Sequence, residues 1–66
     1  MTVHLNGETV DAREARTVEE LVLRFDLPPS AIFIEHNGVA LHRREWPERQ
    51  VRNGDRIEFI RVVAGG

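Results

Sequence analysis

The end of this sequence, Val63-Ala64-Gly65-Gly66, is the segment whose residue types could do chemistry. Glycine has no Cβ, so a Gly-Gly end leaves a terminal carboxylate unshielded and able to enter a narrow channel in another protein. A carboxylate is a poor electrophile, and its simplest activated form is an acyl adenylate, made from ATP by a separate enzyme. A sulfur donor could then displace AMP and leave a thiocarboxylate on Gly66. We therefore predict that Gly66 is the reactive residue and that 62–66 is a flexible functional tail, which reaches at most roughly 17 Å.

The three histidines, His4, His36 and His42, are the other side chains that could take part in catalysis or metal binding. Their spacing, even with an acidic neighbour such as Glu35, matches no metal-ligand signature. His4 and His36 also fall on predicted strands, where surface or partly buried side chains are the rule. We interpret all three as solvated histidines and expect no metal site and no bound cofactor.

Composition narrows the class of protein further. The chain has 66 residues, which is enough for one domain (1–66) but too few for a large enclosed active site, so we expect a carrier or binding protein and not an enzyme. It contains no cysteine, which excludes disulfides, thiolate zinc sites and thiol nucleophiles. All nine basic residues are arginine, so the chain cannot be linked to its own copies through a lysine side chain.

Charge and hydropathy bear on partners and location. The net charge of −2 argues against nucleic acid as the main partner. The sequence has neither a leader-like apolar segment nor an apolar run long enough to span a bilayer, so we expect no membrane association and a cytoplasmic location. We also expect the free protein to be a monomer.

The elements that must position the tail begin with a hairpin and a helix. Val3 and Leu5 alternate with polar residues up to Asn6-Gly7, which predicts a strand, a tight turn and a return strand over 8–12. A capping box from Thr17 to Glu20 then opens a helix over 18–25. One face of this helix is apolar, at Val18, Leu21, Val22 and Phe25.

The second half of the chain reads as strands around a loop. An apolar run at 31–34 predicts a strand, Asn37-Gly38 turns it into a second hairpin, and 42–52 reads as a loop in which Trp46 plugs the core. The last strand, 56–63, is the longest and suits the centre of a sheet. Alternation places Ile57 and Phe59 toward the core and leaves Ile60 and Val62 exposed on the other face.

This order of elements predicts an α+β fold. If the last strand returns beside the first, the two run parallel through a helical crossover, which is the β-grasp arrangement. We therefore expect a mixed sheet of four to five strands with one main helix packed on one face and a flexible C-terminal Gly-Gly tail.

Several segments, in this order and spacing, resemble the ThiS family of thiamine sulfur carriers. They are the strand before Asn6-Gly7, Thr17-Val18-Glu19-Glu20-Leu21, Ile34-Glu35-His36-Asn37-Gly38, Trp46, Asn53-Gly54-Asp55-Arg56-Ile57-Glu58 and Val63-Ala64-Gly65-Gly66. The chain departs from many relatives at Ala64, where a third glycine is common, and at His42, where proline is frequent.

The resemblance implies a ubiquitin-like β-grasp carrier without catalytic activity of its own. An E1-like adenylating enzyme of the ThiF type would use ATP and Mg²⁺ to activate Gly66, a donor such as a cysteine desulfurase would supply sulfur, and a thiazole synthase of the ThiG type would receive it. Gly65, Ala64 and Val63 would line the partner's channel. Ile60 and Val62 would belong to the docking face.

Other functions stay open from the sequence alone. A carrier like the small subunit of molybdopterin synthase, or one that serves tRNA thiolation or amino-acid synthesis, would use the same fold and tail. A ubiquitin-like modifier would instead join Gly66 to a lysine of a target protein. A plain interaction module would carry an inert tail.

Overall fold

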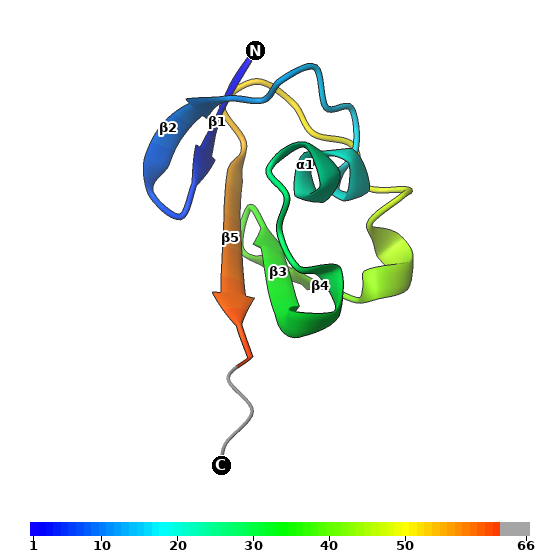
Figure 1. The fold of residues 1–66 in the computed structure, drawn as a ribbon. Helices are drawn as coiled ribbons and strands as arrows, with labels where there is room; N and C mark the ends of the chain where they lie inside the picture. The colour runs from blue at the N-terminus through cyan, green and yellow to red at the C-terminus, as the bar shows by residue number, and fades with distance from the viewer. Residues whose placement is uncertain (63–66) are drawn as a thin grey trace.

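A five-stranded mixed sheet and one α-helix form residues 1–62, the part of the chain that this computed structural model describes (Figure 1). The strand order is β2-β1-β5-β3-β4. The elements in chain order are β1 (Thr2–Leu5), β2 (Glu8–Asp11), α1 (Val18–Arg24), the 3-10 helix η1 (Pro29–Ala31), β3 (Ile32–His36), β4 (Val39–Leu41), the 3-10 helix η2 (Arg43–Glu45) and β5 (Arg56–Arg61).

The last strand occupies the centre of the sheet, as the sequence predicts. β5 runs parallel to β1, with Leu5 opposite Ile57, and antiparallel to β3, with Phe33 opposite Ile60. Two antiparallel hairpins, β1–β2 and β3–β4, complete the sheet on either side. The expected α+β arrangement with a parallel first and last strand is confirmed.

Both hairpins turn at their Asn-Gly pairs. Asn6 and Gly7 have φ values of 50° and 81°, and Asn37 and Gly38 have 50° and 85°. Left-handed backbone at both central positions is the type I′ turn, whose twist matches that of the flanking strands. The two pairs therefore fix the register of both hairpins, because a two-residue loop leaves one way to pair the strands.

Helix α1 begins as predicted, with one difference in its cap. The Thr17 hydroxyl accepts a hydrogen bond from the Glu20 N–H at 3.2 Å. The Glu20 carboxylate accepts from the N–H of Arg16, one residue earlier than in a standard capping box, at 2.9 Å. The helix ends at Arg24, so Phe25 is its C-cap and not its last helical residue.

The core lies between this helix and one face of the sheet. Val18, Leu21 and Val22 bury the apolar face of α1 against the inner sides of the strands. Trp46 is only 3% exposed, which confirms its expected place in the core. Because α1 covers one face, the other face of the sheet stays open to solvent (Figure 1).

Three element boundaries differ from the expected ones. The return strand β2 ends at Asp11, and β3 begins at Ile32 because Pro29 opens the short helix η1 in front of it. Strand β5 ends at Arg61, so the expected strand over 56–63 is too long by at least one residue. None of these differences moves a side chain to the other face of the sheet.

No helix within residues 1–62 is long and apolar enough to cross a membrane.

Candidate functional site

Strand β5 leads to the predicted reactive segment, and the sheet holds it up to Val62. On the β3 side, the Val62 N–H donates to the Ala31 carbonyl at 2.8 Å. On the β1 side, the Asn6 side chain takes the place of a paired strand. The Phe59 N–H donates to Asn6 Oδ1 at 2.8 Å, and Asn6 Nδ2 donates to the Phe59 carbonyl at 3.1 Å. β5 is therefore held on the β1 side as far as Phe59 and on the β3 side as far as Val62.

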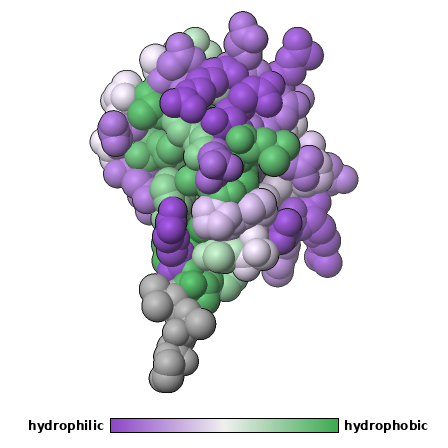
Figure 2. Space-filling model, viewed as in Figure 1, coloured by the Kyte–Doolittle hydropathy of each residue, from purple (hydrophilic) through white to green (hydrophobic). Residues whose placement is uncertain are grey.

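The outer face of the sheet carries an exposed apolar patch at this end. Ile60 is 56% exposed and Val62 is 50% exposed, as the alternation in the sequence predicts. Phe33 lies opposite Ile60 in the ladder and is 64% exposed. We call Phe33, Ile60 and Val62 the outer-face patch. Figure 2 shows hydrophobic surface where β5 leaves the body, while hydrophilic side chains dominate the opposite end.

Two acidic side chains adjoin this patch. Glu35 and Glu58 lie directly opposite each other in the β3–β5 ladder. Like charges across a ladder repel and cost stability. A basic residue on a partner would relieve this repulsion.

The remaining predicted site residues, Val63, Ala64, Gly65 and Gly66, lie outside the described residues. Their predicted roles stay predictions.

A buried polar network surrounds one histidine, and here the expectation of solvated histidines is wrong. His36 is 6% exposed, and its Nε2 lies 2.7 Å from Asp55 Oδ2. The Arg49 Nε–H donates to His36 Nδ1 at 2.9 Å, so Nδ1 is an acceptor and the proton is assigned to Nε2. The arrangement ties β3 to two loops and leaves His36 no free nitrogen for a metal or a substrate.

Asp55 is the centre of this network. Burial by itself raises the pKa of Asp55, but hydrogen bonds from His36, from the Arg52 N–H and from Asn37 outweigh it and hold the pKa below the usual value. The Arg52 and Asn37 bonds are 2.8 and 3.1 Å long. Asp55 therefore links the loop before β5 to the β3–β4 turn through hydrogen bonds.

The other two histidines do not join it. His4 is partly buried and lies 3.1 Å from the Thr9 hydroxyl, and His42 is exposed at the start of η2. Within residues 1–62, no cluster of three or more His, Asp or Glu side chains could hold a metal ion.

The sheet is mixed, one helix covers one of its faces, and the last strand, β5, lies at its centre. This arrangement defines a β-grasp protein. The sequence model of the ThiS family matches residues 3–66. The chain belongs to the ThiS family.

Relatives of known name agree with this assignment. The chain is 27% identical over 66 residues to "Sulfur carrier protein ThiS" of Escherichia coli K12, and the match covers all of both chains. The crystal structure of a thiamine biosynthesis protein (ThiS) from Geobacter metallireducens matches with a TM-score of 0.84 and 28% identity, again over all of both chains. The "Thiazole synthase" of Magnetococcus marinus is 29% identical over 66 residues, and the chain spans only 20% of its length.

Two features of the site were missed by the sequence reasoning. Phe33 sits in an apolar run at 31–34, but its neighbours Ile32 and Ile34 face the core, so strict alternation would have placed Phe33 outside. No short sequence motif predicts the His36 network, because its three members lie far apart in the sequence, at positions 36, 49 and 55.

Proposed function

We propose that this protein is the sulfur carrier of thiamine biosynthesis, with the Gly66 carboxylate as the group that carries sulfur. Membership of the ThiS family is the observation that carries the proposal. The E. coli relative bears the name of a sulfur carrier, and the Geobacter structure that of a thiamine biosynthesis protein.

The chemistry balances with two partner enzymes. A carboxylate oxygen of Gly66 attacks the α-phosphate of ATP, pyrophosphate leaves, and an acyl adenylate forms. The terminal sulfur of a persulfide then attacks the acyl carbon and AMP leaves, which gives an acyl disulfide. A thiol of the partner enzyme cleaves the S–S bond, which releases the thiocarboxylate and leaves the partner with a disulfide. Mg²⁺ and ATP belong to the adenylating enzyme of the ThiF type, and the sulfur comes from a donor such as a cysteine desulfurase. The carrier supplies the carboxylate and the surface that presents it.

The outer-face patch is the proposed docking surface for the adenylating enzyme. It lies on the strand that leads to the reactive segment, so a partner that covers Ile60 and Val62 meets the tail at the same time. The patch is apolar at its centre and acidic beside it at Glu35 and Glu58. A complementary partner surface would be apolar with a basic rim. Val63, Ala64 and Gly65 would occupy the partner's channel.

A thiazole synthase of the ThiG type is the proposed acceptor of the sulfur. In the Magnetococcus relative, a 66-residue stretch similar to this chain lies inside a longer polypeptide named thiazole synthase. Covalent linkage of a carrier-like segment to the enzyme favours thiazole formation over the molybdopterin, tRNA and amino-acid pathways. It likewise favours a carrier over a protein modifier or an inert interaction module.

Complementation tests this function. A bacterial strain that lacks its ThiS gene requires thiazole for growth, and we expect this chain, co-expressed with its own adenylating enzyme and thiazole synthase, to remove that requirement. A variant that lacks Gly66 should fail while accumulating to the same level. Growth with the shortened variant would refute a role for Gly66, and failure of the full chain, with both enzymes shown to be active, would refute the thiamine pathway.

A further inference from the structure

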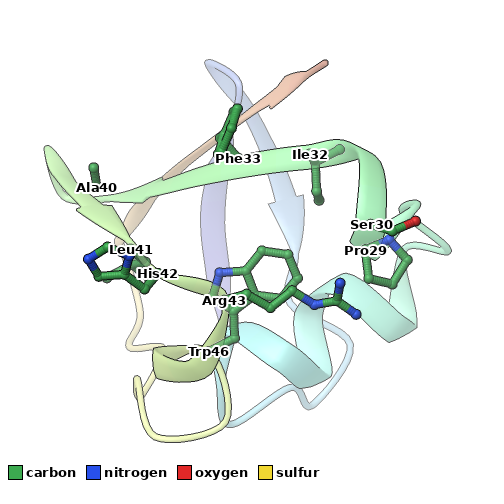
Figure 3. Close-up of a pocket in the computed structure, with 9 residues that line it drawn as sticks. All are labelled: Pro29, Ser30, Ile32, Phe33, Ala40, Leu41, His42, Arg43 and Trp46. Atoms are coloured by element: carbon green, nitrogen blue, oxygen red, sulfur yellow. The ribbon is translucent and has the colours of Figure 1, made fainter. Parts of the chain in front are cut away.

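A groove opens at the end of the sheet where β4 stops (Figure 3). Its volume is about 450 Å³, within the range of ligand sites in proteins. Pro29 and Ile32 line it on one side, Leu41 on another, and Arg43 and Trp46 form its floor. Of its lining residues, only Phe33 also belongs to the outer-face patch. We call it the η-groove because η1 and η2 flank it.

Among residues 1–62, no strand pairs with the edge of β3 inside the η-groove. The bonds from Asn37 N–H to Arg56 and from Val62 N–H to Ala31 show that odd-numbered positions of this segment turn their backbone groups toward β5. Even-numbered positions therefore face β4, because backbone groups alternate along a strand. β4 ends at Leu41, opposite Ile34. The N–H and C=O of Ile32 thus point past the end of β4, where another strand could pair with them.

The charge of the groove is positive. Of the residues that the structure describes, Arg43 and His42 are the charged or titratable ones that line it, and none of its lining residues is acidic. The Arg43 guanidinium carbon lies 5.4 Å from the centre of the Trp46 ring. In Figure 3, Ile32 points from β3 toward Arg43 and Trp46, whereas Phe33 points to the opposite side. A side chain paired with Ile32 would point the same way as Ile32 and approach Arg43.

The floor of the groove also holds an unsatisfied donor. Trp46 is 3% exposed, and within residues 1–62 its indole Nε1 has no hydrogen-bond partner. A buried N–H without an acceptor costs stability.

From these observations, we propose that the η-groove binds an extended, acidic segment of a partner protein, which adds to β3 as a strand in line with β4. The main chain of the segment pairs with Ile32. An acidic side chain opposite Ile32 meets Arg43, and its apolar neighbours lie toward Phe33 and Ala40. The open strand edge favours an extended segment, because strand addition needs free backbone groups. Charge complementarity with Arg43 favours an acidic side chain on one face of that segment, with apolar side chains on the other face.

The single tryptophan makes the test direct. The chain has one Trp and no Tyr, so its tryptophan fluorescence reports on the floor of the groove. The probe is a blocked synthetic pentapeptide, Thr-Val-Glu-Val-Thr, titrated into the full chain. We expect a saturable change in Trp46 fluorescence with a Kd below about 1 mM, and slower amide hydrogen exchange at Ile32.

Matched peptides and variants separate strand addition from loose contact. A peptide with lysine in place of its glutamate should not bind. A peptide methylated on the main-chain nitrogen of the glutamate should not bind either, because methylation removes the N–H that pairs with Ile32. Methylation of the next nitrogen, which points away from β3, should leave binding intact. Arg43→Gln should weaken binding about tenfold, as expected for loss of a charge-assisted hydrogen bond, while Arg44→Gln should change it less than about twofold.

Three results would overturn the proposal. One is the absence of saturable binding, or binding that survives both Arg43→Gln and methylation of the glutamate nitrogen. Another is a fluorescence change in the peptide-free chain when 63–66 are removed, which would assign the groove to the chain's own end. The third is fluorescence that depends on protein concentration without peptide, which would assign it to a second copy.

Discussion

Replacing Ile60 with alanine should weaken the reaction with the adenylating enzyme without unfolding the carrier. Complete burial of an aliphatic side chain contributes about 1.5–3 kcal/mol. Ile60 keeps 56% of its surface exposed, so roughly half of this amount, about 0.8–1.7 kcal/mol, remains to be gained when a partner covers it. The expected loss in kcat/KM is therefore roughly four- to fifteenfold.

The assay is the release of pyrophosphate by the ThiF-type enzyme at varied carrier concentration. Leu23→Ala is the matched control, because Leu23 is 63% exposed but lies on α1, on the opposite side of the sheet. The free energy of unfolding of both variants should lie within about 0.5 kcal/mol of that of the unsubstituted chain, as is usual for substitutions of exposed residues. Equal kcat/KM for Ile60→Ala and Leu23→Ala would refute the outer-face patch as the docking surface.

Three further predictions concern how the fold holds β5. Asn6→Gly keeps the left-handed turn but removes both bonds to Phe59, and chemical denaturation should show a loss of about 1–2 kcal/mol; an unchanged midpoint would show that the amide does not hold the strand. Asp55→Asn should lower stability at pH 7 by about 1–3 kcal/mol. Because folding lowers the pKa of Asp55 from 3.8, the advantage of the carboxylate is complete above that value and is lost as the pH falls through the folded pKa, so urea unfolding at stepped pH should show the two proteins converging in acid; a difference that stays constant would contradict the assignment. Gly54→Ala should cost about 1 kcal/mol from backbone strain alone, since φ is 84° and a Cβ would meet nothing within 4 Å; an unchanged thermal midpoint would argue against strain at this turn.

Local chemistry explains why much of the fold could be predicted from the sequence. Asn6-Gly7 and Asn37-Gly38 need no distant partner to form their turns, and the Thr17 cap and the apolar face of α1 are set within one stretch of chain. The exposure of Ile60 and Val62 followed from the two-residue period of a strand.

The features that could not be predicted depend on residues brought together by the fold. His36, Arg49 and Asp55 meet only once β3 and two loops are packed, so a histidine expected in solvent is buried. The η-groove likewise arises because β4 ends opposite Ile34, two residues after the start of β3. The groove therefore depends on the relative lengths of two strands, which residue types alone do not set. Phe33 differs from both, because its alternation with Ile32 and Ile34 could have placed it on the outer face.

The most direct test of the sulfur-carrier function is the intact mass of the chain after incubation with ATP, a sulfur donor and the adenylating enzyme, followed by a thiol-reactive probe. The chain has no cysteine, so the probe has no competing thiol. Oxidation of Met1 or Trp46 adds nearly the same mass as exchange of oxygen for sulfur, but neither product takes the probe. We predict one probe per chain, located at Gly66 by fragmentation. An unlabelled chain in the presence of demonstrably active enzyme and donor would contradict the proposal that Gly66 carries sulfur.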